Sequence, residues 1–355
     1  MISAAREVAF RILLRIPGGG YASDLLRNQS LRLDPRDAGL AEKIVLGSLR
    51  YQAQLDFLIE RYAGRPQPKL DEEVRAALRM GIYQLRYLDR IPPHAAVAES
   101  VELVKQTAKK SASGFVNAVL RKVNRDPVKW PDRATELSVP NWTLERWQRQ
   151  FGCEISEKIA RAALEEPEAH VNPSTGRQQD IGSQSIVPLL AIEPGMAVLD
   201  LCAAPGNKTA QALEAGARVI ACDRYERRLA EVPAAAERVA LDASEQLPFS
   251  LIEKHGRFDR ILVDAPCSGT GTLARNPEIK WRLKPSDLEV FHRRQRKMIE
   301  RAMEHLKPGG RLVYSTCSLE KEENQDAVKG LRVEQMQTRI PGRDPGDGFF
   351  AAVII

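Results

Sequence analysis

Apolar residues recur every three or four positions through much of the first third of the chain, as at 8–16 and 74–85. This spacing places the apolar side chains on one face of a helix. Glycine- and proline-rich segments, one of them at 65–68, interrupt the pattern and predict turns between helices. Two more amphipathic stretches follow at 97–123. The pattern predicts an all-helical bundle over residues 1–130.

A helical connector is predicted at 131–175, after the bundle. Three tryptophans, Trp130, Trp142 and Trp147, cluster at its start. Large aromatic side chains bury much apolar area, and in a helical segment they serve as packing groups more often than as platforms for base stacking. We therefore expect these three residues to pack against neighbouring helices.

Beyond residue 176 the pattern changes to short β-branched runs that alternate with helical segments. This alternation predicts βαβ units and a mostly parallel sheet covered on both faces, so the fold class of residues 176–355 is α/β. Ligands of such sheets bind beyond the carboxyl ends of the strands. At these ends the chain places acidic and thiol-bearing residues, namely Asp200, Cys202, Asp223, Asp242, Asp264, Cys267 and Cys317.

The positive charge of the chain is concentrated in the predicted bundle. The 355 residues carry a net charge of +6. Residues 1–130 hold 22 Lys and Arg against 14 Asp and Glu, whereas the remainder holds 31 against 33. A localised basic excess suits a phosphate backbone, although a solvated basic face without a partner would give the same count. The charge therefore favours nucleic acid as the partner of the bundle.

No apolar run approaches the roughly 18 residues that a membrane-spanning helix needs, and the charged N-terminal stretch is unlike a signal peptide. We expect a cytoplasmic protein without a membrane partner. The five cysteines are odd in number and form no CxxC pair. That pattern disfavours both a metal site and a disulfide framework. The thiols are expected to be reduced and available for chemistry.

The turn after the first predicted strand reads Asp200-Leu-Cys-Ala-Ala-Pro-Gly-Asn-Lys-Thr209. Its small residues let backbone approach a ligand closely, but its single glycine differs from the three-glycine signature that binds a pyrophosphate. A nucleoside without pyrophosphate fits better. Asp223 and Asp242 close the second and third strands, where carboxylates accept hydrogen bonds from ribose or lie beside adenine. Each could instead cap the helix that follows it.

Several motifs resemble those of one family. HAAVAESVELVK and GFVNAVLR are similar to the closing helices of the NusB-like RNA-binding domain, and DLCAAPGNKT is close to the CAAPGGKT motif of RNA cytosine-C5 methyltransferases. A NusB-like bundle followed by this domain resembles the RsmB (Fmu/Sun) family, which methylates cytosine in 16S rRNA. The resemblance implies a class I Rossmann-like methyltransferase domain, RNA binding by the bundle, and S-adenosyl-L-methionine as cofactor.

The resemblance also implies which residues line the cofactor site. They are Cys202, Ala203, Ala204, Pro205, Gly206, Asn207, Lys208, Asp223, Asp242 and Asp264. Asn207 stands where the family normally has glycine. If that position requires a positive φ, asparagine is the least costly replacement for glycine. Lys208 either supports the cofactor or the catalytic acid, or is a surface lysine of the following helix.

Two cysteine motifs, Asp264-Ala-Pro-Cys267 and Ser315-Thr-Cys-Ser318, stand at strand ends. Amino-group methyltransferases of this fold tend to carry Pro-Pro-aromatic at the first place, so Pro-Cys points to a carbon target. Carbon 5 of cytosine is too weak a nucleophile to attack a sulfonium methyl directly, so a thiolate must first add at carbon 6. An acid must also act at ring nitrogen N3, and Asp264 is the candidate.

The residues alone leave open which cysteine attacks. By resemblance, Cys317 is the nucleophile and Cys267 assists release of the product. The target base must leave its stack to reach a thiol, so we expect an unpaired or readily opened cytosine in a loop of 16S rRNA. We expect the enzyme to be a monomer. A run of basic residues at 293–301 either grips flanking phosphates or is a solvated helix face.

The chain is shorter than the family pattern in three places. Val171-Asn-Pro173 runs almost directly into Gln179-Asp180, where the family usually has a small α/β subdomain. The segment from Asp223 to Asp242 is contracted, and few residues separate Glu323-Asn324 from the closing strands. The contractions allow a different class of function, a non-catalytic RNA-binding or antitermination-type protein. A tRNA cytosine-C5 methyltransferase would share every catalytic motif, and only the N-terminal domain favours rRNA.

Overall fold

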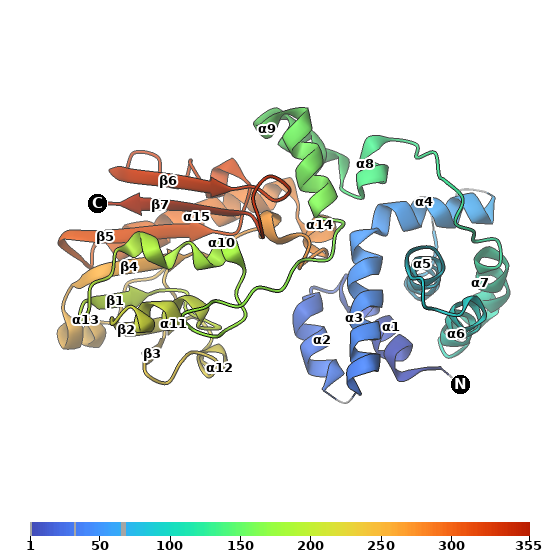
Figure 1. The fold of residues 1–355 in the computed structure, drawn as a ribbon, viewed down its shortest axis with the longest axis horizontal. Helices are drawn as coiled ribbons and strands as arrows, with labels where there is room; N and C mark the ends of the chain where they lie inside the picture. The colour runs from blue at the N-terminus through green and yellow to red at the C-terminus, as the bar shows by residue number, and fades with distance from the viewer. Residues whose placement is uncertain (1, 32, 65–68) are drawn as a thin grey trace. The chain divides into compact units, whose positions relative to one another are not determined.

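The computed structural model describes every residue except 1, 32 and 65–68, so the turn predicted at 65–68 lies outside the described residues. The chain folds into two compact units (Figure 1). The helical unit comprises Met1–Glu166 together with Leu273–Arg282, which we call the inserted segment. The sheet unit comprises Pro167–Thr272 and Leu283–Ile355. The domain boundaries at 130 and 175 remain predictions from the sequence.

The all-helical bundle predicted for the first third of the chain is confirmed. Its helices are α1 (Ala4–Arg15), α2 (Ala22–Ser30), α3 (Pro35–Arg50), α4 (Gln52–Ala63), α5 (Glu72–Tyr87), α6 (Pro93–Lys105) and α7 (Ser113–Leu120). The unit continues through α8 (Arg133–Leu137) and α9 (Asn141–Ala162), and the inserted segment adds α14 (Ile279–Arg282). Trp147 is fully buried and Trp130 packs on the core of the bundle, which confirms the packing role predicted for these two tryptophans.

Local sequence explains how the bundle packs. The Asp34 side chain accepts hydrogen bonds from two backbone N–H groups of the first turn of α3, and Pro35 starts that helix, a combination that favours a helix beginning here. Gly47 lets α3 and α5 approach closely, because a Cβ atom there would lie 1.9 Å from the Tyr83 ring. Ile12, Ile44 and other fully buried aliphatic residues fill the centre.

The inserted segment is held in the helical unit by hydrogen bonds to the end of α3. The Leu49 carbonyl accepts from Trp281 Nε1 at 2.7 Å, and the Arg50 carbonyl accepts from Lys280 Nζ at 2.7 Å. Nε and Nη2 of the Arg50 guanidinium donate to the Ala274 carbonyl at 3.0 and 2.7 Å. These bonds satisfy polar groups that would otherwise be costly to bury.

Lys280 should make the stability of the protein depend on pH. Burial, together with the neighbouring Arg50 charge, lowers the pKa of Lys280 to about 7. Between this value and the ordinary lysine pKa, the unfolded chain binds one more proton than the folded chain. The free energy of unfolding therefore rises with pH above 7, by up to about 1.4 kcal/mol per pH unit. Urea unfolding at pH 7 to 9 measures this slope, and Lys280→Met should remove its contribution.

The exposed Lys105 provides the control, because Lys105→Met should leave the slope of the wild-type protein unchanged. Equal slopes for wild type and Lys280→Met would mean that Lys280 keeps its proton in the folded state.

The sheet unit contains a seven-stranded sheet in the order β3-β2-β1-β4-β5-β7-β6. Its strands are β1 (Ala197–Asp200), β2 (Arg218–Asp223), β3 (Glu237–Ala240), β4 (Phe258–Asp264), β5 (Leu306–Thr316), β6 (Val333–Arg339) and β7 (Phe349–Ile354). The first five in this order pair in parallel, whereas β7 is antiparallel to both β5 and β6. The predicted α/β fold is thus confirmed.

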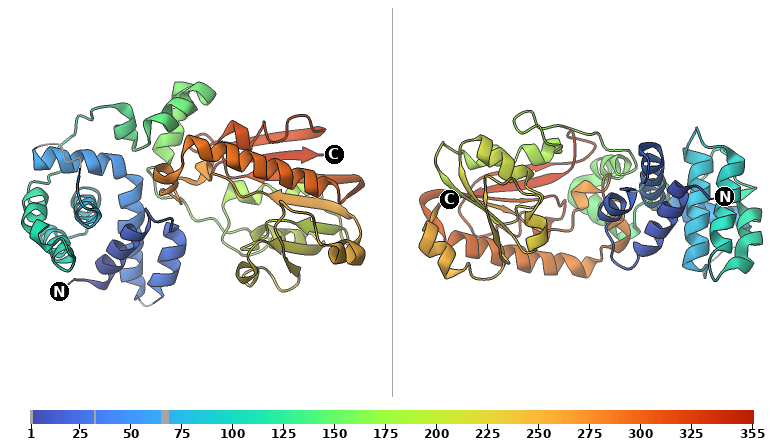
Figure 2. Two further views of the ribbon diagram at one scale, coloured as in Figure 1. Left: turned by 180° about the vertical axis from the view of Figure 1, so that it is seen from behind. Right: turned by 90° about the horizontal axis from the view of Figure 1, so that it is seen from below.

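Helices cover both faces of the sheet. The helices of this unit are α10 (Ile181–Gln184), α11 (Asn207–Glu214), α12 (Glu226–Leu229), α13 (Phe249–His255) and α15 (Pro285–Met303). Figure 2 shows α15 running along one face, where Met298 and Ile299 join a core with Leu199 and Ile261. Val198 and Leu262, which alternate with those strand residues, face a second core on the opposite side. None of the described helices is both long and apolar enough to span a membrane.

Candidate active site

The two cysteine motifs meet at the carboxyl ends of neighbouring strands. In the parallel pairing of β4 with β5, Asp264 stands opposite Ser315, so the chain leaves both strands at the same edge. Cys267 Sγ and Cys317 Sγ lie 3.3 Å apart, within hydrogen-bonding distance. The structure therefore brings together the two thiols that the sequence singled out, although 50 residues separate them along the chain.

Asp264 lies at the end of β4 and is fixed by two side chains. Its Oδ1 accepts from Ser315 Oγ at 2.7 Å, and its Oδ2 pairs with Lys208 Nζ at 2.6 Å. Lys208 is only 9% exposed, so it is not the surface lysine that one interpretation of the sequence allowed. The lysine instead supports the candidate catalytic acid.

Backbone hydrogen bonds join the turn after Cys267 to the end of β5. Gly271 N donates to the Cys317 carbonyl at 2.9 Å, and the Gly271 carbonyl accepts from Gly348 N at 2.8 Å. A Cβ atom on Gly271 would lie 2.4 Å from the Gly348 carbonyl oxygen, a distance that backbone atoms cannot tolerate. Only glycine permits this approach, which brings the two thiols together.

The two active-site thiols share a hydrogen bond, and this contact affects Cys267. The hydrogen bond with Cys317, together with burial, raises the pKa of Cys267 well above its ordinary value. Cys267 therefore keeps its proton at neutral pH, and either sulfur can be the donor in the pair.

A buried carboxylate that sequence reasoning missed lies beside both turns. Glu323 has no exposed surface, and it accepts hydrogen bonds from the side chains of Ser268 and Ser318, the residues that follow the two cysteines. The sequence Lys321-Glu-Glu-Asn324 gave no signal that one of its acids is buried, because it reads as a charged surface turn.

The turn at residues 200–209, which we call the cofactor turn, contains one residue with a left-handed backbone. The residue with left-handed backbone is Gly206, at φ 97°, whereas Asn207 begins helix α11. The position of Asn207 therefore does not require a positive φ. Asn207 instead joins the turn to the preceding segment, since its Oδ1 accepts from Arg177 Nε at 2.8 Å and its Nδ2 donates to the Gln178 carbonyl at 3.0 Å.

Three carboxylates lie at the carboxyl ends of neighbouring strands, at the edge of the sheet where a cofactor is expected to bind. Asp200 and Asp223 end β1 and β2, and Asp242 lies just beyond β3. Burial raises the pKa of Asp200 to about 6, and its Oδ1 is buried without a hydrogen-bond partner in the described part of the chain. Asp223 accepts from Tyr225 N at 2.9 Å, so this residue also caps the turn that follows it.

This row of acceptors fits S-adenosylmethionine. The ribose hydroxyls, the amino group and the adenine amine of that molecule are all hydrogen-bond donors, which carboxylates accept. Asp223 and Asp242 would hold the nucleoside, and the turn that includes Gly206 would let backbone approach it closely.

The basic residues of α15 are engaged by acids of the sheet unit. Arg294 Nη2 lies 3.6 Å from Asp242, and Lys297 Nζ lies 2.9 Å from Glu245. Arg293, Arg296 and Arg301 pair with glutamates on or just after the same helix. These contacts favour the solvated-face interpretation over a phosphate grip.

One of the three contractions noted in the sequence, that between Asp223 and Asp242, corresponds to a short connection in the structure. Helix α12, Glu226–Leu229, is the only helix between β2 and β3 in the described residues. Pro233 packs on the cofactor turn, since its Cδ lies 2.7 Å from the place where a Gly206 Cβ would be. The catalytic motifs are unaffected by this shortening.

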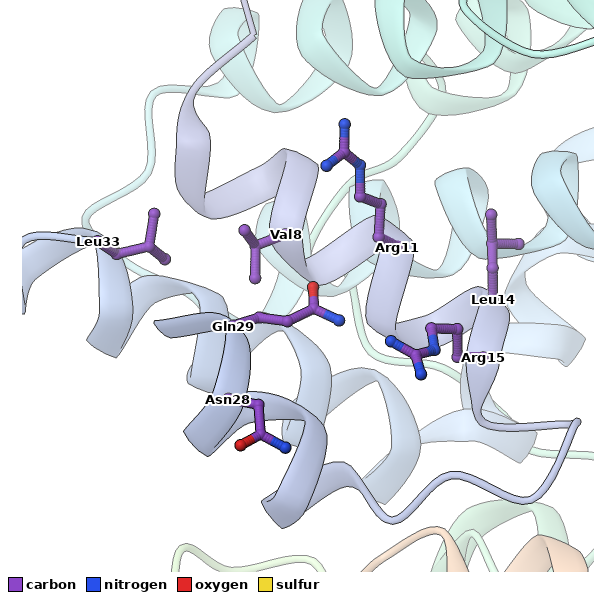
Figure 3. Close-up of a pocket in the computed structure, with 7 residues that line it drawn as sticks. All are labelled: Val8, Arg11, Leu14, Arg15, Asn28, Gln29 and Leu33. Carbon is purple, nitrogen blue, oxygen red and sulfur yellow. The ribbon is translucent and has the colours of Figure 1, made fainter. Parts of the chain in front are cut away.

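The helical unit carries a groove of about 650 Å³ between α1 and α2 (Figure 3). Apolar side chains and polar side chains that can contact RNA both line it. They are Val8, Arg11, Leu14, Arg15, Asn28, Gln29 and Leu33. The mixture of cationic, amide and apolar groups can accommodate both a phosphate and the face of a base.

The sheet order, the acidic strand ends and the paired thiols define an S-adenosylmethionine-dependent methyltransferase, here joined to a NusB-like bundle. The family described as 16S rRNA methyltransferase RsmB/F matches residues 187–332, and the NusB family matches residues 3–125. Ribosomal RNA small subunit methyltransferase B of Yersinia pseudotuberculosis serotype O:1b is 31% identical, covering 99% of this chain and 98% of its own. The same enzyme of Klebsiella pneumoniae strain 342 is 31% identical, with coverages of 96% and 95%. The chain belongs to this family of rRNA methyltransferases, and its cofactor is S-adenosylmethionine.

The relatives also account for the short connections. The Yersinia comparison extends over 422 residues, more than the 355 residues of this chain, so the relative has insertions without a counterpart here. Among solved structures, that of PH0851 matches with a TM-score of 0.77 over 99% of both chains at 20% identity. A methyltransferase homologue from Pyrococcus horikoshii matches with a TM-score of 0.51 over 62% of this chain and 96% of its own, at 23% identity. Both likenesses support the fold.

Proposed function

We propose that this enzyme methylates carbon 5 of a cytosine in 16S rRNA, through a covalent bond between Cys317 Sγ and carbon 6 of the base. The observation that carries the proposal is the 3.3 Å separation of the Cys267 and Cys317 sulfurs at the ends of β4 and β5. A methyltransferase acting on nitrogen or oxygen has no need for two thiols, because its target already has a reactive lone pair. Carbon 5 requires a nucleophile that adds, and later leaves, at carbon 6.

Cys317 performs the addition. Its sulfur attacks carbon 6, and the thiol proton is transferred to N3 of the ring, so that the addition is neutral overall and carbon 5 becomes nucleophilic. Asp264, which pairs with Lys208 and accepts a hydrogen bond from Ser315, binds the ring at N3. There it relays the thiol proton to the ring nitrogen. S-adenosylmethionine, when bound at the acidic strand ends, supplies an electrophilic methyl group on its sulfonium.

Cys267 assists the release. Once carbon 5 carries the methyl group, a base such as a water molecule takes the C5 proton, and the electron pair of that C–H bond forms the double bond between carbons 5 and 6. The bond between Cys317 and carbon 6 then breaks, with its electron pair returning to sulfur. The protonated Cys267 thiol donates a hydrogen bond to that sulfur and stabilises the leaving thiolate. This division of roles agrees with the raised pKa of Cys267.

The target cytosine must be unpaired or readily opened, because C6 of a stacked and paired base is not accessible to a thiol. Both cysteines, Asp264 and the cofactor turn come from one chain, so we take the active enzyme to be a monomer. The NusB-like bundle, with its basic excess, binds the rRNA.

The test is to identify the methylated nucleoside. The protein is incubated with labelled S-adenosylmethionine and unmodified 16S rRNA, with tRNA in a parallel reaction, and the RNA is digested to nucleosides. The expected product is 5-methylcytidine in 16S rRNA and not in tRNA. Label in tRNA alone would give the substrate as tRNA, and an N-methylated base would refute the carbon-5 proposal. RNA that binds without receiving methyl would favour a non-catalytic RNA-binding protein.

The groove between α1 and α2 provides a prediction for RNA binding. Changing Arg11 and Arg15 together to glutamine should weaken rRNA binding about tenfold and make it less dependent on salt, because two phosphate contacts are lost. Filter binding between 50 and 200 mM salt measures both effects. The matched control changes Arg61 and Lys105, exposed cations outside the groove, to glutamine. Equal losses in both double variants would mean that only net charge matters.

A further inference from the structure

One carboxylate, that of Glu323, binds both of the turns that carry the cysteines. Its Oε1 accepts from the backbone N–H of Ser268 at 2.8 Å and from Gln295 Nε2 at 2.9 Å. Its Oε2 accepts from Ser318 Oγ at 2.5 Å and also from Ser268 Oγ. The two serine hydroxyls lie 3.0 Å from each other. Ser268 directly follows Cys267 and Ser318 directly follows Cys317, so Glu323 links the neighbours of both thiols.

Burying this group has an energetic cost that the fold alone does not require. Moving a carboxylate out of water is unfavourable, and a well-packed apolar group in its place is often as stable or more so. Four hydrogen-bond donors offset that cost here. Gln295 adds a further link, since its Nε2 also donates to the Pro266 carbonyl at 3.0 Å, next to Cys267. Glu323 and Gln295 thus both hold the turn that carries Cys267.

We propose that Glu323 is a positioning residue that sets the distance between the Cys267 and Cys317 sulfurs, and thereby the rate at which the enzyme releases its product. Release depends on the hydrogen bond from Cys267 to the leaving Cys317 sulfur, which requires a separation near the observed 3.3 Å. This inference rests on the proposed covalent mechanism and deepens it. Glu323 itself touches neither the base nor the cofactor in this role.

Replacing the carboxylate by an amide tests this role with little change in volume. In Glu323→Gln, the amide oxygen can still accept from Ser268 N and Gln295 Nε2, but the NH2 group would face the Ser268 and Ser318 hydroxyls, which must then accept instead of donate. The two links to the serine hydroxyls are thus changed from charge-assisted to weaker neutral hydrogen bonds. We expect release of the RNA adduct to slow at least about tenfold while formation of the adduct slows less. The KM for S-adenosylmethionine should remain within about twofold of the wild-type value, because the acidic strand ends are untouched.

The experiment follows one turnover with rRNA and measures two rates for the full-length protein. A denaturing gel reports the covalent protein–RNA adduct, and nucleoside analysis reports free 5-methylcytidine. Glu334→Gln serves as the control, since Glu334 is an exposed acid of the same unit that pairs with Arg311. A general loss of structure would lower both rates and the cofactor affinity together, whereas the proposal requires a selective effect on release.

The outcomes are distinguishable from those that test the function itself. If the wild-type protein forms neither adduct nor 5-methylcytidine, the proposed function fails. If it forms both, and Glu323→Gln releases the adduct as fast as wild type, only the positioning role is overturned. Should Glu323→Gln not fold, Ser318→Ala decides the question, because it removes one link and leaves the other donors to Glu323 in place. Unchanged release in that variant would equally refute the proposal.

Discussion

Cys317→Ala should reduce methyl transfer to rRNA by about 1,000-fold or more, because carbon 5 is never activated without a nucleophile at carbon 6. Removing a sulfur at the end of β5 leaves the acidic strand ends unchanged, so the variant should still bind S-adenosylmethionine with wild-type affinity. Equilibrium binding of the cofactor and the rate of label transfer, measured on the same preparation, separate these two effects.

The exposed Cys153 of α9 supplies the matched control, and Cys153→Ala should transfer methyl at the wild-type rate. A Cys317→Ala protein that retains more than a few per cent of activity would contradict the covalent mechanism. The same activity lost in Cys153→Ala would indicate a general sensitivity to loss of a cysteine.

Cys267→Ala should convert the enzyme into one that traps its substrate. The first addition of Cys317 proceeds, but the leaving sulfur lacks the Cys267 thiol that lies 3.3 Å away in the wild-type protein, so later turnovers should slow at least about 100-fold. The bound RNA should remain on the protein through denaturation and migrate with it as a slow band. This band is the measurement, and it requires S-adenosylmethionine because the trapped species is the methylated adduct.

The double variant of both cysteines is the decisive comparison, since it must give no band if Cys317 forms the bond. A band that persists without Cys317 and disappears without Cys267 would exchange the roles of the two residues. If neither single variant forms an adduct while both lose activity, the thiols would have a structural role instead.

The five parallel strands and the residues at their ends could be predicted from sequence, because a parallel sheet buried on both faces leaves short β-branched runs. Asp264, Cys267 and Cys317 were found for the same reason, since each follows such a run directly. That the two thiols would be 3.3 Å apart could not be predicted, because it depends on β4 and β5 being neighbours and on the close approach at Gly271.

The residues that sequence reasoning missed or left open depend on tertiary contacts. Glu323 stands among other charged residues, and only the fold shows that it is buried among hydrogen-bond donors. Because the family normally has glycine at the position of Asn207, the sequence left open whether that position needs a left-handed backbone; in the structure the preceding Gly206 makes the turn and Asn207 opens a helix. A single residue type constrains the backbone too weakly to decide between adjacent positions.

The membership of the inserted segment in the helical unit also had no signal in the sequence. Leu273–Arg282 directly follows the catalytic turn in the chain, but it shares its packing with residues more than 220 positions earlier. The local sequence pattern can indicate a short helix at α14, but it cannot indicate which of the two units that helix packs into.

The inserted segment makes the two units inseparable as genetic modules. A gene cut after Glu166 would give a methyltransferase fragment that exposes Trp281 and carries Glu278 and Lys280 without the backbone groups of the bundle that satisfy them. A bundle expressed alone would lose the peptide that covers the end of α3. Recombination between relatives should therefore preserve function only when the bundle and residues 273–282 are exchanged together. Selection is then expected to keep these two distant stretches of the gene compatible with each other.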